Sequence, residues 1–487
     1  MLRRSFLRSL AAAPAAGLVR FPCGLVTEAM AQQRGGMAQA DPFKPLEGAN
    51  SPMGVSRAIH AGRVAWVRDA KATSWDATTG NWWDDANTNQ RAVDRMISRL
   101  LLDVTGRKND KQAWDALFRS FNETHKLGRG GYRPGEKIAI KVNFNQDRGP
   151  DWATMTRPGP PRPAGADRGG APPDAARGGA PPAGGPARGN APAPLNGLPS
   201  PHAVLALITQ LIETAGVRGE DIILYDACGQ RTIGQPVYGR IRANSNKNFQ
   251  AVTFVANDEY KLGGRIPPIP DTANPIQFSK AGVPVAYLPQ QVTAAKYMIN
   301  MALLRAHGMA GVTLIGKNHF GSVYFPNNNG WSPSALHSYV LRTMPMGSYN
   351  ALVDLMGHRH LGGKTMLYML DGLYTAAHNE ASVYRWQSFG NQWASSMLMS
   401  QDPVALDSVG LDALRNEPLA TEVRGTPENY LHEGAQAAKP PSGTVYNPDK
   451  SGPLASLGVH EHWNNATDKK YSRNLGRKEG IELIASL

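Results

Sequence analysis

The alternation of strand-like and helix-like apolar segments constrains the fold of this chain more than any other feature. Residues 137–144 (KIAIKVNF) have the pattern of a strand, residues 200–216 that of a helix, and residues 221–227 (DIILYDA) that of a second strand. The segment 221–227 is continuously apolar, as is typical of a strand buried on both faces of a parallel sheet. Strand, helix and strand in succession predict an α/β fold, with a mostly parallel sheet and helices on both faces.

The same patterns continue along the chain. Strands are expected at residues 63–68, 251–255, 283–288, 296–301 and 364–370. Helices are expected after Asn89, around residues 114–121, and at residues 335–342, 349–356 and 403–414. Ser200-Pro201 and Asp402-Pro403 each place a capping side chain directly before a proline at the first helical position, which favours a helix start at both places.

These elements predict a single α/β domain over residues 58–415. It follows a linker at 32–57 and precedes a loop-rich extension, 416–487, that packs on the same domain. A low-complexity insertion at 150–199 interrupts the domain, and within it the sequence RGGAPP at 168–173 recurs at 177–182. An insertion so rich in Pro, Gly, Ala and Arg buries too little apolar surface to offset its ordering entropy, so we expect it to be disordered.

Residues 1–31 are expected to be a cleaved signal peptide. The segment LRRSFLR at 2–8 is similar to a twin-arginine export motif, a short apolar stretch follows at 10–19, and cleavage is expected near Ala31. The expected partner is therefore the twin-arginine translocase, and the expected location is periplasmic or extracellular. No other segment is apolar for long enough to cross a membrane, so no membrane span is expected in the mature form.

Charge and cysteine content narrow the function classes. The net charge is +13, but the basic residues are scattered in singles and pairs. A nucleic-acid partner would require a concentrated basic surface, so the charge favours small anionic ligands instead. Of the two cysteines, Cys23 lies in the signal peptide, which leaves Cys228 alone. Neither a disulfide nor a cysteine-bound iron–sulfur cluster is expected within one mature chain.

Four polar residues end the expected strands, namely Asn143, Asp226, Asn300 and Asp371. Because ligands of parallel sheets bind beyond the carboxyl ends of the strands, these side chains are expected to converge on one cleft. The alternative is that each one only caps a turn.

The segment 300–321 (NMALLRAHGMAGVTLIGKNHFG) carries the densest set of polar candidates. Lys317 could hold a carboxylate or phosphate, His307 could carry a proton, and Asn318 could orient a ligand. A lysine that extends to solvent and a structural histidine are the corresponding alternatives. The stretch GVTLIGKN at 311–318 lacks the hydroxyl residue of a nucleotide-binding phosphate loop, and its interior is apolar, so that function is not expected.

A divalent metal is the cofactor that the residues allow. Asp371, with His378 in the loop that follows, could bind a cation, and Asp402 is either a helix cap or a third ligand. No H-E-x-x-H or G-x-S-x-G sequence is present, which disfavours a zinc protease or an α/β-hydrolase.

Six stretches resemble, in order, the family catalogued as domain of unknown function 362. They are KVNF at 141–144, the helix at 200–216, ILYDACG at 223–229, the segment 300–323, DG at 371–372 and DPVALDSVG at 402–410. The resemblance implies an α/β fold and a shared polar site drawn from Lys141, Asn143, Asp226, Asn300, His307, Lys317, Asn318, Asp371 and Asp402. Many members carry ferredoxin-type cysteine motifs, which this chain lacks.

The leading hypothesis is a metal- or cofactor-dependent enzyme that acts on a small anionic substrate. Lys141 and Lys317 would hold the anion, and His307 would exchange protons. Asp226, Asp371 and Asp402 would bind a cation or move protons, and the asparagines would orient groups. The alternative is a non-catalytic protein that captures a metal or an anion outside the cytoplasm.

Overall fold

The computed structural model describes residues 47–147, 149, 151–153, 197–229, 231–257, 262–327, 330–377 and 382–487. All of them belong to one compact unit that comprises Phe43–Met155 and Ala180–Leu487. Most of the insertion at 150–199 and all of the expected signal peptide lie outside the described residues.

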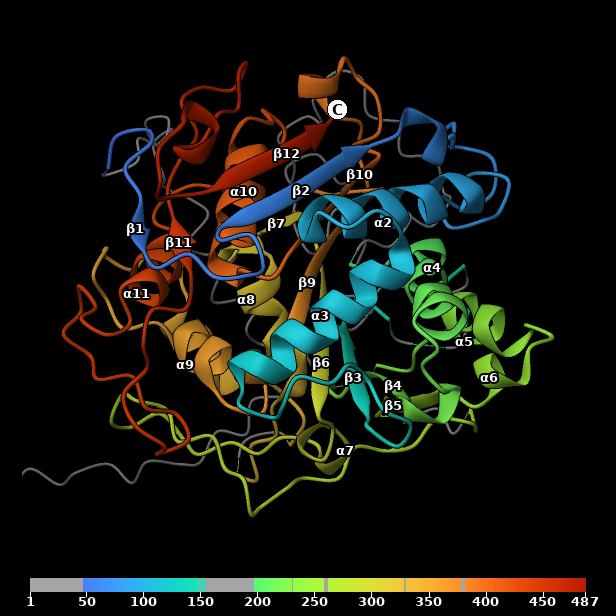
Figure 1. Cartoon of the computed structure of the whole chain (residues 1–487), viewed down its shortest axis with the longest axis horizontal. Coiled ribbons are helices and arrows are strands. Elements are labelled where there is room, and N and C mark those ends of the chain that lie inside the picture. The colour runs from blue at the N-terminus through green and yellow to red at the C-terminus, as the bar shows by residue number, and fades with distance from the viewer. Residues whose placement is uncertain are drawn as a thin grey trace, which may run out of the picture. The chain divides into compact units, whose positions relative to one another are not determined.

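An eight-stranded sheet forms the centre of this unit (Figure 1). Its order is β12 (Glu482–Ser486), β2 (Arg63–Arg68), β10 (Ser396–Ser400), β9 (Thr365–Gly372), β6 (Tyr297–Leu303), β3 (Ile138–Val142), β4 (Ile222–Asp226) and β5 (Thr253–Ala256). Strand β10 is antiparallel to both of its neighbours, and all other pairs are parallel. The predicted α/β class with a mostly parallel sheet is confirmed.

Helices cover both faces of the sheet because its strands are apolar on both. In β3, Ile138 and Ile140 pack against one layer, and Ala139 packs against the other. The first layer contains α2 (Gln90–Thr105), α3 (Asp110–Thr124), α4 (Pro201–Thr209), α5 (Gln235–Arg242) and α6 (Lys247–Gln250). The second contains α7 (Gln290–Thr293), α8 (Ile315–Asn318), α9 (Ala351–Gly357), α10 (Pro403–Arg415) and α11 (Asn429–Ala435).

The predicted helix starts are confirmed in their side-chain contacts. The Ser200 hydroxyl accepts from the backbone N–H of Ala203, and the Asp402 carboxylate accepts from that of Ala405. Each of these bonds satisfies a backbone donor that the first helical turn leaves without a partner.

Two predicted elements differ from the structure. Residues 283–288 form no strand and have only isolated bridges, Ala286 with Ile276 and Tyr287 with Tyr324. The expected helix at 335–342 is a 3₁₀ segment, Ser334–Tyr339. Both segments are short, and an apolar pattern of that length fits more than one local structure.

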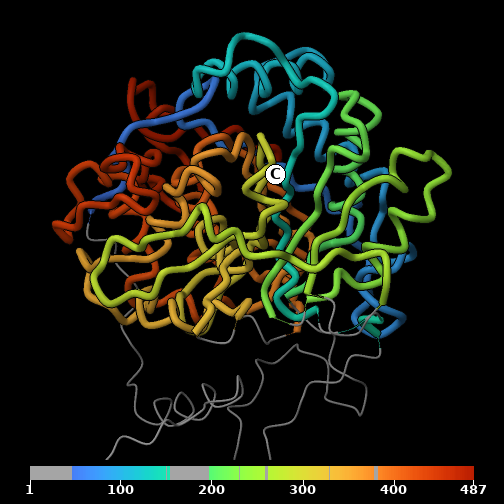
Figure 2. Tube along the Cα trace, turned by 90° about the horizontal axis from the view of Figure 1, so that it is seen from below, coloured from blue at the N-terminus to red at the C-terminus, as the bar shows by residue number. Residues whose placement is uncertain are grey.

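The two ends of the described chain contribute more structure than expected. The extension after residue 415 supplies α11, the sheet strand β12 and the short strand β11 (Val459–His460). Strand β11 pairs with β1 (Met53–Gly54), which lies in the segment expected to be a linker. Figures 1 and 2 both show this N-terminal segment lying against the C-terminal part of the chain.

Candidate functional site

The segment 300–321 folds back over the sheet from which it leaves. Strand β6 runs on to Leu303, so Asn300 lies within the strand rather than at its end. The chain then forms a hairpin of β7 (Arg305–His307) and β8 (Gly311–Thr313) and returns as α8. The Asn318 amide donates to Asn300 Oδ1 over 2.7 Å and to Met301 O over 3.2 Å, which fixes α8 on β6.

Lys141 lies beside Asn300 in the sheet and is held by three acceptors. Its Nζ atom is 2.8 Å from Val142 O, 3.2 Å from Asn318 Oδ1 and 3.3 Å from Asp226 Oδ2. An ammonium group has three N–H donors, so these contacts use all of them. Burial lowers the pKa of Lys141, and the adjacent Asp226 carboxylate opposes that shift. Lys141 therefore acts as part of the scaffold under α8.

Gly321 allows the backbone to lie directly on this ion pair. A Cβ atom at Gly321 would be 2.3 Å from Asp226 Oδ1 and 2.6 Å from Lys141 Nζ. Asp226 also accepts from the backbone N–H groups of Phe144 and Cys228, at 2.9 and 3.2 Å. These contacts bring Lys141, Asp226, Asn300 and Asn318 together in one buried network.

Lys317 is buried but differs from Lys141 in its surroundings. Its side chain is 7% exposed, its Nζ lies 3.6 Å from the centre of the Phe320 ring, and no described residue accepts a hydrogen bond from it. Burial lowers the pKa of Lys317 to about 7; Cys228 opposes this shift and the Arg305 guanidinium adds to it. The ammonium group is therefore available to a ligand and can exchange a proton near neutral pH.

Two arginines extend the positive charge around Lys317. Arg305 is 1% exposed, and its single described hydrogen bond is a long one, 3.4 Å, to Thr313 Oγ1. Its Nε and Nη1 atoms are buried, with no hydrogen-bond partner in the described part of the chain. Burial and the neighbouring Arg231 lower the pKa of Arg305 to about 9, so the guanidinium is charged at pH 7. Arg231 donates to Asn145 Oδ1 over 3.0 Å, and no described residue accepts a hydrogen bond from its Nε.

We define Arg231, Arg305 and Lys317 as the cationic cluster. No carboxylate of the described chain forms an ion pair with any of the three. Sequence reasoning identified Lys317 but missed both arginines. The signal for Arg305 was present, since a charged residue follows directly on the apolar stretch 301–304 within the segment already selected.

The remaining predicted site residues are not part of the cationic cluster, and several of them accept hydrogen bonds from backbone N–H groups. Asn143 Oδ1 accepts from the N–H of Asn145, which is a turn contact. His307 Nδ1 accepts from the N–H groups of Met309 and Ala310 within its own hairpin.

The two expected metal ligands that the structure describes, Asp371 and Asp402, lie apart. Asp371 accepts from the N–H groups of Ser200 and Leu373, and burial raises its pKa to about 6. Because β10 is antiparallel to β9, Asp402 lies near the start of β9, about 17 Å along the strands from Asp371 at its end. His378, the third expected ligand, lies outside the described residues.

Asp407 on α10 positions α8. Its carboxylate accepts from the N–H groups of Ile315 and Gly316, at 2.8 and 3.0 Å, and from the Tyr430 hydroxyl at 2.8 Å. An acidic side chain at this end of a helix satisfies donors that have no partner within the helix. Asp407 thereby fixes the turn that carries Lys317 and Asn318.

Two pockets occur elsewhere on the described surface. One, of about 300 Å³, lies near Tyr238 and Arg265, and the other, of about 380 Å³, lies near Lys280 and Tyr349. None of the predicted site residues lines either pocket.

Residues 191–412 match the model of the family described as "Domain of unknown function (DUF362)", which supports the resemblance to that uncharacterised family. The matched range contains the cationic cluster and begins after Lys141 and Asn143. A search of curated proteins found no match. None of the helices in the described part of the chain is both long and apolar enough to cross a membrane.

Proposed function

We propose that this protein binds a small anionic ligand through Arg231, Arg305 and Lys317. The observation that carries the proposal is the buried Arg305 guanidinium, whose Nε and Nη1 donors have no acceptor among the residues that the structure describes. A charge taken out of water without a partner costs several kcal/mol, so a protein rarely keeps one without a use. An oxyanion would supply both the missing acceptors and the missing negative charge.

The mixture of side chains favours a phosphate or a carboxylate. Guanidinium groups bind such planar or tetrahedral oxyanions with two parallel hydrogen bonds, and Lys317 adds a point charge. The Cys228 thiol lies among the same cations, since it influences the protonation of both Lys141 and Lys317.

We propose that the protein is an enzyme that acts on a small anionic substrate. Lys317 supports this form, because a pKa of about 7 suits a group that donates or accepts a proton during a reaction. The alternative is a binding protein without catalysis. The two differ in whether Lys317→Arg, which keeps the charge but cannot release a proton, retains the function.

The test is a calorimetric titration of the full chain with inorganic phosphate and with malonate. Arg305→Met should weaken binding of at least one of these anions about 10- to 100-fold, since a charged hydrogen bond contributes about 1.5–3 kcal/mol. The same variant should raise the melting temperature of the ligand-free protein, because it removes an unpaired buried charge. Arg63→Met is the matched control, since it removes the same charge from an arginine paired with Glu482.

The proposal fails if Arg305→Met lowers the ligand-free melting temperature and leaves anion affinity unchanged. That pair of results would show that Arg305 contributes to folding only. Equal loss of affinity in Arg63→Met would attribute binding to overall net charge.

We propose further that the protein is exported through the twin-arginine pathway. The sequence of residues 2–31 supports this, and replacement of Arg3 and Arg4 by lysines tests it. Export of a reporter protein fused to these residues should be lost in the double-lysine variant, whereas unchanged export would refute the pathway.

A further inference from the structure

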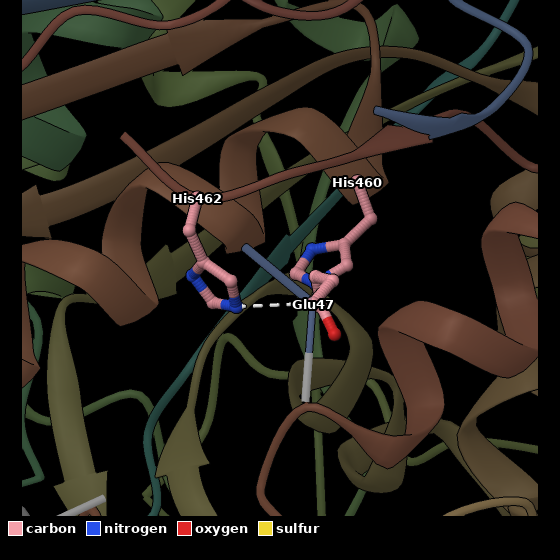
Figure 3. Close-up of side chains that lie close together, drawn as sticks. All are labelled: Glu47, His460 and His462. Atoms are coloured by element: carbon pink, nitrogen blue, oxygen red, sulfur yellow. Dashed lines mark hydrogen bonds and ion pairs between the residues drawn. The ribbon is translucent and has the colours of Figure 1, made fainter. Parts of the chain in front are cut away.

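A second cluster of chemically active side chains lies far from the cationic cluster in sequence and outside the set predicted above. His432 Nε2 and His460 Nε2 each lie 2.9 Å from Glu47 Oε1, and His462 Nε2 lies 3.2 Å from the same atom. Figure 3 shows Glu47, His460 and His462 pointing toward one another. The residues come from the segment before β1, from α11 and from the β11 region, and the four side chains are at most 11% exposed.

The second ring nitrogen of His462 reveals which nitrogen carries its proton. Nδ1 is 2.6 Å from Asp412 Oδ1, and this carboxylate also accepts from the Trp463 N–H and the Tyr471 hydroxyl. A carboxylate only accepts, so Nδ1 must be the donor. In the neutral ring Nε2 then presents a lone pair, and that lone pair faces the Glu47 carboxylate.

His460 has the same arrangement through a serine. The Ser408 hydroxyl donates to Val404 O over 2.7 Å, so its oxygen is left to accept from His460 Nδ1, also at 2.7 Å. The Nε2 atom of His460 therefore also presents a lone pair to Glu47 Oε1. Two neutral imidazoles and a carboxylate that aim lone pairs at one point repel one another unless a proton or a metal ion lies between them.

We infer that Glu47, His432, His460 and His462 bind one divalent metal ion of the zinc class. Imidazole nitrogens combined with a carboxylate oxygen are ligands that suit zinc, cobalt and nickel. The contacts of His462 with Asp412 and of His460 with Ser408 are the outer hydrogen bonds that orient metal-binding histidines. In addition, Glu47 Oε2 is buried and has no hydrogen-bond partner within the described ranges of the chain.

The spacing of the ligand atoms fits a tetrahedral ion. With metal–ligand bonds of about 2.0–2.1 Å, neighbouring ligand atoms of a tetrahedron lie about 3.3 Å apart. The observed distances from Glu47 Oε1 to the three imidazole nitrogens are 2.9, 2.9 and 3.2 Å. The ligand atoms of Glu47, His460 and His462 all lie within 4.8 Å of one another. His432 is outside that group of three, and a rotation of its side chain toward the other ligands would complete the coordination.

Four protein ligands leave no open position, which indicates a structural ion. Glu47 is separated from His432 by 385 residues and from His460 by 413 residues. The ion would therefore join the N-terminal segment to the C-terminal part of the chain, next to the pairing of β1 with β11. This role is independent of anion binding by the cationic cluster.

The experiment measures metal in the full chain, produced without a polyhistidine tag. Elemental analysis after gel filtration should find about one divalent ion per chain, and cobalt substitution should give the visible absorption of a tetrahedral site. His462→Gln and Glu47→Gln should each lower zinc affinity by about 100-fold or more, and Asp412→Asn by about 10- to 100-fold. His360→Gln is the control, since His360 belongs to the other H-x-H pair and contacts Asn274 instead of a carboxylate.

Removal of the ion from the unsubstituted protein gives a second readout that needs no variant to fold. Chelation should lower the melting temperature, and added zinc should restore it. The inference is overturned if the folded, chelator-treated protein takes up no zinc or cobalt, because the cluster would then be held by protons alone. Zinc uptake that His462→Gln and Glu47→Gln leave unchanged would place the ion elsewhere and would also overturn it.

Discussion

Anion binding should be linked to uptake of a proton by Lys317. In the ligand-free protein the pKa of Lys317 is about 7, so at pH 8 only about one tenth of the molecules carry the charge. A bound anion favours the charged form and should return the pKa toward its ordinary value of about 10.4. Binding at pH 8 should therefore take up about 0.9 proton at Lys317.

The neighbouring Arg305 contributes little to the number of protons taken up on anion binding. The pKa of Arg305 is about 9, so the guanidinium is already about nine-tenths charged at pH 8 and adds about 0.1 proton. The pKa values of Lys317 and Arg305 are both lowered in the free protein and should rise when the anion binds. The complex therefore binds more protons than the free protein, so anion affinity falls as pH rises above 7. Between pH 8 and 9 the dissociation constant should increase about tenfold or somewhat more.

Calorimetry with sulfate measures the uptake directly, because sulfate itself does not titrate near neutral pH. Titrations at pH 8 in two buffers of different ionisation enthalpy give the number of protons taken up. Lys317→Met should reduce that number from about 1.0 to about 0.1. Binding without proton uptake in the unsubstituted protein, or the same uptake in Lys317→Met, would refute the assignment of Lys317 as an anion ligand.

Two further predictions concern the scaffold beneath α8, and both are measured by chemical denaturation of the ligand-free protein. Lys141→Met should cost about 3–5 kcal/mol because it leaves the Asp226 carboxylate buried without its partner. Lys137, directly before the same strand, is half-exposed, and its partner Asp221 also pairs with Arg218, so Lys137→Met should cost about 1 kcal/mol or less. Equal costs would contradict the role of the buried pair. Gly321→Ala should cost about 1–3 kcal/mol because its Cβ would meet the same ion pair. Gly308→Ala is the control, since Gly308 has open space around it. A Gly321→Ala variant of unchanged stability would show that the backbone at Gly321 does not lie directly on the ion pair.

The fold was predictable where local pattern and tertiary environment agree. Strand β4 is continuously apolar in sequence and buried on both faces in the structure, and the cap at Ser200 needs only its neighbours to form. Residues 283–288 show the opposite case, since Val283, Ala286 and Leu288 are buried in the core although the segment does not join the sheet, and Val285 is exposed. Propensity cannot separate those two outcomes.

The candidate site was predictable in part. Lys141, Asp226, Asn300 and Asn318 meet in one buried network, because strand register and the return of α8 bring them together. Asn143 and Asp371, which were expected to join Asp226 and Asn300 in one cleft, make separate contacts with backbone N–H groups. The sequence could not show that Lys141 uses all its donors internally while Lys317 has no acceptor among the described residues, since this depends on which acceptors the fold brings near.

The histidine cluster was beyond sequence reasoning for a similar reason. His460 and His462 form an H-x-H pair that places both rings together only in an extended segment. The C-terminal extension was expected to be loop-rich, and Glu47 lies in a segment expected to be a linker. The contact between them depends on the pairing of β1 with β11 across the whole chain.

The most direct test of the central claim is the anomalous diffraction of crystals of the full chain grown in selenate. Selenate has the charge and shape of sulfate and phosphate, and its selenium gives an unambiguous peak. If the cationic cluster binds the anion, a selenium peak should lie within about 4 Å of both the Arg305 guanidinium and Lys317 Nζ, at the distance of hydrogen-bonded oxyanions. Ordered selenate at other surface positions, with no peak beside Arg305, would contradict this prediction.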